Sequence, residues 1–500
     1  MSDLDALPVD LYSAAACREL DRISIEQYEI AGYELMCRAG QAILDRLQEK
    51  YHLTQRIIVC CGAGNNAGDG YVLARLAMQA GYKVEVVSLV DPKKLNGDAA
   101  RAYKDWKSMG HQLSDFNSKL MHRSDVIVDA LLGTGLEREV EGAWREVIEE
   151  MNQSAVPVIS VDIPSGLSAD TGTVMGVAVK ADMTISFIGL KKGLFTHQAA
   201  DYCGEIFFDS LSVPEEVYKQ VAADAQLLHW SLLQDWIKPR QHDSHKGQFG
   251  HVLVVGGNYG MAGAVRLSAE AALRTGAGLV SVITRPEHVS AVLAGRPEVM
   301  VHGTNELIPQ HLLHKADVII IGPGLGRDDW ANRLLGQVLE TNSPKVIDAD
   351  ALGLLAQVED VRDHNWVLTP HPGEAARLLD EIAEIIQKER FSACELIQQQ
   401  YGGTVVLKGA GSLINSSQTP VKVCAYGNPG MASAGMGDVL SGLIGALIAQ
   451  GLPLAVAAEL AVLVHASAGD RAAESGQRGL LASDLFDSIR SLLNPECTQD

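Results

Sequence analysis

The apolar residues of the chain fall into short, nearly continuous runs that alternate with longer amphipathic stretches. In the first half, runs rich in Val and Ile predict strands at residues 56–61, 82–90, 125–132, 156–163 and 183–189. Continuous apolar runs of this length suit strands that are buried on both faces, as in parallel sheets. Helical patterns lie between them at 68–81 and 136–152. The alternation predicts a doubly wound α/β domain.

The same alternation stops and then starts again. Residues 213–250 contain no strong strand and end in a polar, basic loop. Further strands are predicted at 251–257, 278–284, 317–324, 344–350, 366–370 and 404–409. No residue-level repeat links the halves, only the same architecture. We therefore predict two α/β domains, residues 1–225 and 226–500.

One segment is apolar enough to raise the question of a membrane span. Residues 439–469 are interrupted by Gly451-Leu452-Pro453 and contain Glu459 and His465. Proline breaks a helix, and a span needs about 20 consecutive apolar residues. The segment therefore predicts two buried helices. The acidic start of the chain is unlike a signal peptide, so we expect a cytoplasmic protein.

Length and charge limit the class of protein. A chain of 500 residues suggests roughly three domains at about 150 residues each, which the strand pattern reduces to two large ones. The net charge of −21 argues against nucleic-acid or acidic-membrane partners, because no basic field is available to neutralise phosphates. Anionic ligands must therefore be held locally, for example by backbone N–H groups. Eight cysteines without a C-x-x-C predict neither a zinc site nor disulfides.

A glycine-rich loop follows the first strand and opens a helix. Residues 62–70, GAGNNAGDG, formally match G-x-G-x-x-A, and Asp91 lies at a distance compatible with a dinucleotide fingerprint. A merely structural turn is the alternative, since glycine turns after strands are common. Asn65, Asn66 and Asp69 exceed what a tight turn needs. They place amides and a carboxylate where a helix N-terminus already favours anions.

Two further strand ends carry polar clusters. Asp129 is followed by the Gly-Thr-Gly of 133–135, and Asp162 is followed by Ser165 and Gly166. In open α/β sheets, ligands gather at the carboxyl ends of the strands, so the clusters can converge on one crevice. A buried capping role remains the alternative for either aspartate.

Together GAGNNAGDG, VDALLGTGL and VDIPSGL resemble the Rossmann-like epimerase domain of NAD(P)HX repair enzymes, over most of residues 10–220. The resemblance implies a substrate hydrated at C6 of its nicotinamide ring, whose R and S epimers the domain interconverts. It assigns a potassium ion to Asn66, Asp129 and Ser165, and places Asp162 at the substrate. The other substrate contacts it implies are Asn65, Asn66, Ala67, Gly68, Asp69, Gly133, Thr134, Gly135, Leu136, Glu137, Arg138 and Glu139.

Epimerisation requires a proton to leave and return, or ring opening through an iminium ion. A carboxylate near the hydroxyl assists either route, and Asp162 is our candidate for it. Potassium would fix the loop geometry through hard oxygen ligands. The family loop commonly has Gly where this chain has Ala67, and a methyl group is tolerable there if φ is negative.

The second half carries Ala434-Gly435-Met436-Gly437-Asp438 directly before an apolar helix. Small residues at such a start leave N–H groups free to cradle phosphate oxygens. Asp438 can take a proton from a substrate hydroxyl as it attacks phosphorus. A plain helix cap is the alternative. Other loops suited to anions are GGNYGMAGA (256–264), GPGLG (322–326), TPHPGE (369–374), KGAGS (408–412) and GNPGMA (427–432).

In this order the loops resemble the ribokinase-like dehydratase domain of the same repair system, over about 230–495. The resemblance implies that ADP phosphorylates the S-epimer and that phosphate is then eliminated, which gives NADH or NADPH, AMP and phosphate. Magnesium is expected to bridge the phosphates. Implied substrate contacts are Ala264, Gly324, His371 and Asp438, the last as base. Implied nucleotide contacts are Lys408, Gly409, Ala410, Gly411, Ser412 and Gly437.

Several of these residues have simpler explanations. His371 stands between two prolines, where a histidine often hydrogen-bonds the backbone. Lys408 can pair with a phosphate, which we favour, or with a carboxylate across the sheet. His242 and His245 in the linker are better explained by a solvated loop than by a metal site.

The sequence thus predicts a bifunctional repair enzyme acting on NADHX and NADPHX, with ADP as co-substrate and without nucleic-acid or membrane partners. We also expect a homo-oligomer, because this fold family often assembles. Two alternatives remain. The second half is a small-molecule kinase, or the first half is a non-catalytic sensor that regulates it. Preference for ADP or ATP, and for NADHX or NADPHX, stays open.

Overall fold

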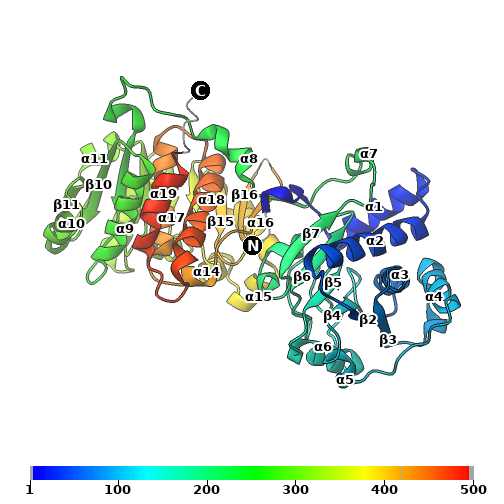
Figure 1. Ribbon diagram of the computed structural model, residues 1–500. Helices are drawn as coiled ribbons and strands as arrows, with labels where there is room; N and C mark the ends of the chain where they lie inside the picture. Colours follow the sequence, from blue (N-terminus) through cyan, green and yellow to red (C-terminus); the bar gives the residue numbers. More distant parts are fainter. Residues whose placement is uncertain (1–3, 418, 495–500) are drawn as a thin grey trace. The chain divides into compact units, whose positions relative to one another are not determined.

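The computed structural model describes residues 4–417 and 419–494 and divides into two compact units between Gln226 and Leu227 (Figure 1). Each unit has its own sheet with helices on both faces, which confirms the predicted doubly wound α/β class. Short strands β1 (Asp10–Leu11) and β8 (Ala225–Leu227) pair antiparallel near the division.

The sheet of the first unit is entirely parallel, in the order β3-β2-β4-β5-β6-β7. Its strands are β2 (Arg56–Cys61), β3 (Lys83–Ser88), β4 (Val126–Ala130), β5 (Val158–Val161), β6 (Met183–Phe187) and β7 (Glu205–Asp209). The apolar runs predicted the first five, and the structure shortens all but β2 by two to four residues. β7 was not predicted, because its EIFFD is half-exposed and has no long apolar run.

Both faces of this sheet are buried. Ile57, Val59 and Cys61 of β2 belong to the cluster under one helix layer, while Ile58 and Cys60 face the other layer. The first layer is α1 (Ala14–Glu26), α2 (Gly32–Lys50), α3 (Asn65–Gln79) and α4 (Gly97–Ser108). The second layer is α5 (Ser118–Met121) and α6 (Ala143–Gln153), and α7 (Glu215–Tyr218) follows β7. Double burial explains the unbroken apolar runs.

The second unit has a mixed sheet in the order β17-β16-β15-β14-β13-β12-β9-β10-β11. Strands β9 to β15 pair in parallel, and β16 and β17 add antiparallel neighbours to β15. The strands are β9 (His251–Val255), β10 (Leu279–Thr284), β11 (Met300–Gly303), β12 (Val318–Ile321), β13 (Lys345–Ile347), β14 (Trp366–Leu368), β15 (Thr404–Leu407), β16 (Ser412–Ser416) and β17 (Val421–Cys424).

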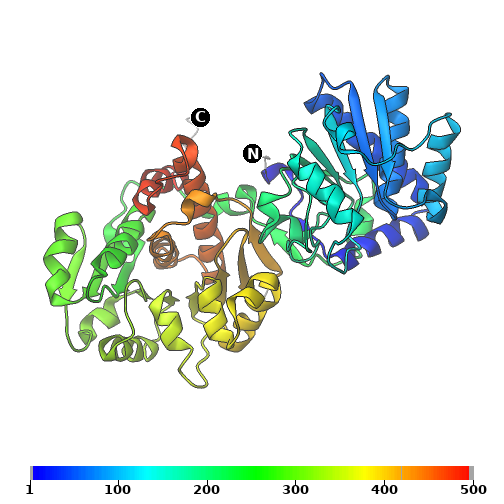
Figure 2. The same cartoon turned by 90° about the horizontal axis from the view of Figure 1, so that it is seen from below.

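Two helix layers cover this sheet as well (Figure 2). One layer packs on Val252, Val254 and Ile320 and contains α9 (Ala262–Thr275), α17 (Met436–Ala449), α18 (Leu454–Ala472) and α19 (Leu485–Leu492). Helices between the parallel strands cover the opposite face: α12 (Asp329–Leu339), α13 (Asp350–Leu355), α14 (Pro372–Leu379), α15 (Ala383–Lys388) and α16 (Arg390–Tyr401). Shorter helices are α8 (Trp230–Leu233), α10 (Val289–Gly295) and α11 (Gln310–Lys315).

The structure also bears on three further predictions. Segment 439–469 forms parts of α17 and α18, and no helix among the described residues is long and apolar enough to cross a membrane. The described cysteines are free thiols, and Cys497 lies outside the described residues. The helix predicted at 136–152 is wrong in its first half: α6 begins at Ala143, because Gly142 adopts φ +59°.

Candidate functional sites

The strand order reverses direction once in each unit. In the first unit the reversal lies between β2 and β4, and in the second it lies between β9 and β12. Ligands of open α/β sheets bind at the carboxyl ends of the strands beside such a switch point. The loops after these four strands are the glycine-rich segments that begin at Gly62, Leu131, Gly256 and Gly322. The topology therefore places the sequence motifs where a ligand is expected.

The three residues assigned to potassium lie together at the first switch point. The Ser165 hydroxyl is 2.5 Å from Asp129 Oδ1 and 3.1 Å from Leu132 O, while Asn66 Nδ2 donates to Leu132 O at 3.1 Å. Asp129 is fully buried, and burial raises the pKa of its carboxyl. Asp129 also accepts hydrogen bonds from Leu131 N, Ser165 N and Ser160 Oγ, so carboxylate, hydroxyl and carbonyl oxygens gather at one point. Such a set of hard oxygens fits a monovalent cation.

A cavity of about 800 Å³ opens beside this cluster. Of the implied substrate contacts, it is lined by Asn65, Asn66, Asp69, Asp162 and the segment 133–138. Ala67, Gly68 and Glu139 do not line it. Ala67 and Gly68 lie buried within α3, where Gly68 packs against Met36. Because Ala67 is helical, with negative φ, its methyl group is tolerated as predicted.

Asp162 enters this cavity from a strained backbone. Its φ is +67°, a conformation that aspartate adopts rarely and that often marks a functional position. Oδ1 accepts a hydrogen bond from Phe187 N at 3.1 Å and forms an ion pair with Lys191 Nζ. The Lys191 side chain is only 2% exposed and also donates to Ser186 Oγ and Phe187 O. The sequence reading missed Lys191, although it lies in the loop directly after a predicted strand.

A third carboxylate, Asp21 of α1, also lines the cavity and was missed. Burial raises the pKa of Asp21 to about 6, and Asp162 adds to the shift while Lys191 opposes it. On sequence alone Asp21 is one polar position of an amphipathic helix. Only the tertiary packing brings it beside residues more than 100 positions away.

In the second unit, Asp438 lies in the first turn of α17. The helix begins after Gly435, whose φ of +91° only glycine adopts readily, and the first N–H groups of a helix have no intrahelical acceptor. Burial raises the pKa of Asp438 to about 7, with Asp348 and Asp350 adding to the shift and Lys408 opposing it. A carboxyl with a pKa near neutrality is suited to proton transfer.

Lys408 lies between carboxylates. Its Nζ is 2.9 Å from Asp348 Oδ1 and 3.7 Å from Glu374 Oε2. The contact present is thus the carboxylate that the sequence left as the alternative to a phosphate. Thr369 Oγ1 donates to the same Asp348 oxygen at 2.7 Å, whereas the buried Oδ2 of Asp348 has no hydrogen-bond partner among the described residues. Asp348 and Glu374 were missed, because each resembles an ordinary strand-end or helix-capping acid.

The KGAGS segment forms a tight turn that the Arg390 side chain of α16 stabilises through hydrogen bonds. Gly409 N donates to Ser412 Oγ at 3.3 Å, and the buried Arg390 guanidinium donates to Lys408 O, Leu407 O and Gly411 O at 3.2 to 3.4 Å. Gly409 and Ala410 are exposed. His371 caps α14: its Nδ1 accepts from Gly373 N at 3.0 Å, as its simpler explanation required, and Nε2 lies 3.3 Å from Glu374 Oε1.

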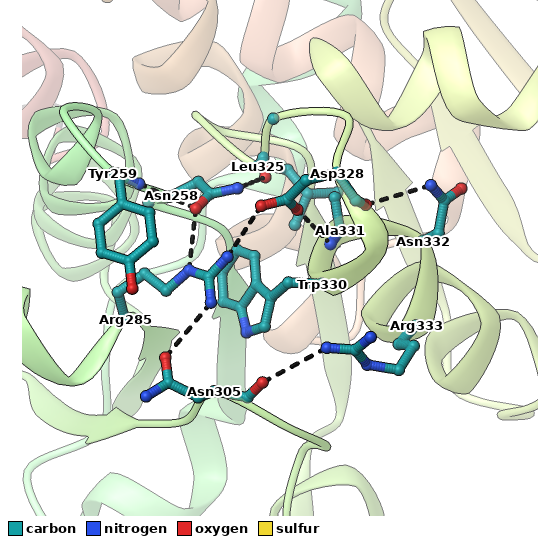
Figure 3. Close-up of polar contacts among 12 residues, drawn as sticks. Asn258, Tyr259, Arg285, Asn305, Leu325, Asp328, Trp330, Ala331, Asn332 and Arg333 are labelled. Atoms are coloured by element: carbon teal, nitrogen blue, oxygen red, sulfur yellow. Dashed lines mark hydrogen bonds and ion pairs between the residues drawn. The ribbon is translucent and has the colours of Figure 1, made fainter.

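One cluster ties the loop before α9, the helix that contains Ala264, to the loop that contains Gly324 (Figure 3). The Arg285 guanidinium lies over the rings of Tyr259 and Trp330, with Cζ 4.5 and 4.3 Å from their centroids. Its Nε donates to Asn258 Oδ1 and its Nη2 to Asp328 Oδ2, both at 2.9 Å. Asn258 N in turn donates to Gly324 O at 2.7 Å. The sequence reading gave no role to this cluster.

Comparison with known families matches each unit separately. A model described as YjeF-related protein N-terminus matches residues 32–193, and one described as NAD(P)H-hydrate dehydratase matches residues 252–491. A ribokinase-like superfamily protein of Enterococcus faecalis has 32% identity and a TM-score of 0.51, and covers 54% of this chain and 96% of its own. A hypothetical protein of Streptococcus mutans has 30% identity and a TM-score of 0.50, and covers 54% of this chain and 98% of its own.

Curated relatives match both units at once. The bifunctional NAD(P)H-hydrate repair enzyme of Coxiella burnetii is 49% identical over 97% of this chain and 99% of its own. Those of Escherichia coli and Vibrio cholerae are 42% and 45% identical over 99% of this chain and 96% and 100% of their own. Such identity over both units confirms the resemblance found in the motifs. The chain belongs to the bifunctional NAD(P)H-hydrate repair enzymes.

Proposed function

We propose that the first unit interconverts the R and S hydrates of NADH and NADPH, and that the second unit dehydrates the S hydrate with ADP, which becomes AMP and phosphate. The main support for this proposal is that each unit has a site at its switch point, with a carboxyl group near the residues that the family motifs assign to substrate or nucleotide binding. Full-length relatives named for hydrate repair support it.

In the dehydratase unit, Asp438 takes the proton of the C6 hydroxyl as the hydroxyl oxygen attacks the β-phosphorus of ADP. The free N–H groups at the start of α17 and the ammonium of Lys408 stabilise the negative charge on the phosphate oxygens. Phosphorylation is useful here because hydroxide is a poor leaving group and phosphate is a good one. Phosphate then leaves from C6 and a proton leaves from C5, which restores the C5=C6 double bond of the reduced ring.

The residues present fit the magnesium ion that the family implies. Proteins usually bind Mg²⁺ through one or two carboxylates together with substrate phosphates. Among the described residues, the buried Oδ2 of Asp348 has no hydrogen-bond partner, and Glu374 lies close to the same Lys408 ammonium group as Asp348. These two residues would hold the ion, which would neutralise phosphate charge. No group of three or more His, Cys, Asp or Glu among the described residues could hold a metal ion, so a full protein cage is not proposed.

In the epimerase unit, Asn66, Asp129 and Ser165 would hold potassium, which keeps the loops after β4 and β5 together. Their converging oxygens support this assignment. Asp162 assists proton transfer at C6 from the cavity wall.

The test is incubation of the purified chain with mixed R and S hydrates, without nucleotide, with ADP and with ATP. We expect loss of both epimers and recovery of the reduced-nicotinamide absorbance only with nucleotide, and the two nucleotide arms give the preference. A stable phosphorylated product would instead indicate a small-molecule kinase. Consumption of the S epimer alone would indicate that the first unit is a sensor.

A further inference from the structure

The epimerase cavity contains more ionisable groups than one assisting carboxylate requires. Asp21, Asp69 and Asp162 line it from α1, α3 and the loop after β5, and Lys191 lines it from the loop after β6. Of these three carboxylates, only Asp162 forms an ion pair with Lys191, although Arg18 and Arg138 also line the cavity. The inference below rests on the proposed epimerisation and concerns how these groups divide the work.

Hydrogen bonds hold one oxygen of the Asp162 carboxyl group, and the other oxygen is left without a donor in the part of the chain that the structure describes. Its Oδ1 is held by Lys191 Nζ and Phe187 N, while no described residue donates a hydrogen bond to Oδ2. The carboxylate is 18% exposed, and its residue lines the cavity. Lys191 is held in turn by Ser186 and Phe187, so the ion pair has a fixed direction. A carboxylate anchored through one oxygen leaves the other free to accept a proton.

Asp69 is in the opposite situation. It lies in the second turn of α3 and has neither a hydrogen bond nor an ion pair with any other described residue. Burial raises the pKa of Asp69 well above its ordinary value, and the charges of Asp162 and Asp21 raise it further, whereas Lys191 acts against the shift. Two carboxyl groups in one site whose surroundings differ in this way are the usual pattern of an acid and a base.

We propose that Asp69 and Asp162 are the two catalytic proton-transfer groups of the epimerase site, Asp69 as the acid and Asp162 as the base, and that Lys191 is the positioning residue that holds Asp162 through Oδ1 in the cavity wall. Burial, and then the charges of Asp162 and Asp21, favour the protonated form of Asp69 by raising its pKa.

The step balances with water as the co-reactant. The ring nitrogen donates its lone pair to C6, the C6–O bond breaks, and the leaving oxygen takes the proton of Asp69 and departs as water. A second water adds to the other face of the C6=N iminium carbon and gives its proton to Asp162. Asp69 ends ionised and Asp162 protonated, and transfer through cavity water restores both. The oxygen at C6 is therefore replaced at each inversion.

The test compares isosteric variants in the full-length chain without nucleotide, so that only epimerisation is measured. We expect D69N and D162N each to lower the epimerisation rate at least ~100-fold, the upper range for a proton-transfer group. We expect K191M to lower the epimerisation rate by a comparable factor, and K191R to retain part of the wild-type rate. Asp45 of α2 is exposed and does not line the cavity, so D45N is the control, within about threefold of the wild-type rate.

Two measurements distinguish a catalytic role of these residues from a purely structural one. Dehydration of purified S hydrate by the second unit should stay unchanged in every variant, whereas loss of the buried Lys191–Asp162 pair lowers the melting temperature in D162N and K191M. The wild-type rate should fall on the alkaline side as Asp69 loses its proton, and this fall should be absent from the residual activity of D69N. The charged groups facing Asp69 are Asp21, Asp162 and Lys191, and Arg18, Asp98, Glu137 and Arg138 line the same cavity.

Epimerisation in ¹⁸O-water should incorporate one ¹⁸O at C6 per inversion. Inversion that keeps the original oxygen overturns the inference, as does near-wild-type epimerisation by D69N or by K191M. If the wild-type chain itself does not interconvert the hydrates, the proposed function fails first, and the inference falls with it.

Discussion

The two switch points of this chain share a backbone geometry but differ in the side chains that surround it. In the first, Gly62 N donates to Ala130 O at 3.0 Å across the reversal, and in the second, Gly257 N donates to Pro323 O at 2.9 Å. In both units, a glycine after the first strand beside the switch point therefore hydrogen-bonds the carboxyl end of the neighbouring strand or the loop that follows it. The shared geometry explains why both sites are glycine-rich.

The difference lies in what surrounds that frame. The first site is lined mainly by side chains, among them the Asp21, Asp69 and Asp162 carboxyl groups and the buried Lys191, which come from two helices and two loops. The second site combines glycine loops and the open start of α17 with the side chains of Lys408, Asp348 and Asp438. A site that moves protons on a ring needs placed side chains, whereas one that binds phosphates uses N–H groups. A net charge of −21 is compatible with phosphorylated ligands for the same reason.

The largest effects should separate the two sites completely. We expect D438N to lower dehydration of the S hydrate at least ~100-fold, the upper range for loss of a general base, while epimerisation stays unchanged. D162N should show the converse. Purified single epimers, followed by chromatography and by absorbance, measure the two rates. Loss of both activities in either variant would contradict the separation, and retained dehydration in D438N would remove its role as base.

Matched glycine variants test the shared frame. A Cβ at Gly62 would lie 1.8 Å from Leu131 O, and one at Gly256 would lie 2.0 Å from Pro323 O. Overpacking of this kind costs about 1–3 kcal/mol. We expect G62A to lower the temperature at which epimerisation is lost, and G256A to do so for dehydration. Gly336, whose Cβ would meet nothing within 4 Å, is the control, and G336A should leave both temperatures unchanged. Equal loss of both activities in G62A would contradict the account.

The pH dependence should also differ between the sites. Asp438 must be ionised to act as a base, and its pKa is raised to about 7 by burial and by Asp348 and Asp350. Dehydration should therefore be full above pH 7 and fall about tenfold per unit below it. The rate of S-hydrate dehydration between pH 5.5 and 8.5, at saturating nucleotide, checks this. A rate that stays constant down to pH 5.5 would mean that Asp438 is not the titrating base.

The smallest effect concerns the Arg285 cluster, which has no counterpart in the first site. R285A removes the hydrogen bonds to Asn258 and Asp328 that join the loop before α9 to the loop of Gly324. Charge-assisted hydrogen bonds contribute about 1.5–3 kcal/mol each, but exposed partners can rebind water. We expect about a tenfold rise in KM for the S hydrate, equivalent to 1.4 kcal/mol, with little change in kcat. A fall in kcat at constant KM would assign the cluster to the reaction instead.

The sequence predicted what depends on local pattern. Buried parallel strands leave continuous apolar runs, and phosphate loops leave glycine, so the sheets, the switch-point loops and Asp438 could be found. Asp21, Lys191 and Asp348 could not, because their importance comes from neighbours distant in sequence. Asp21 resembles a surface position of α1, and Asp348 lies within a Val-Ile-Asp run whose buried oxygen is apparent only in the fold. Ala67 and Gly68 show the reverse, since both match the motif yet face the core.

Complementation between two inactivated chains tests most directly whether each unit carries one complete site. With ADP and a mixture of hydrates, D162N alone should consume only the S epimer, and D438N alone should restore no reduced nicotinamide. A mixture of the two variants should consume both epimers, since the R epimer is converted on one chain and dehydrated on the other. Failure of the mixture to consume the R epimer faster than D162N alone would contradict two independent sites.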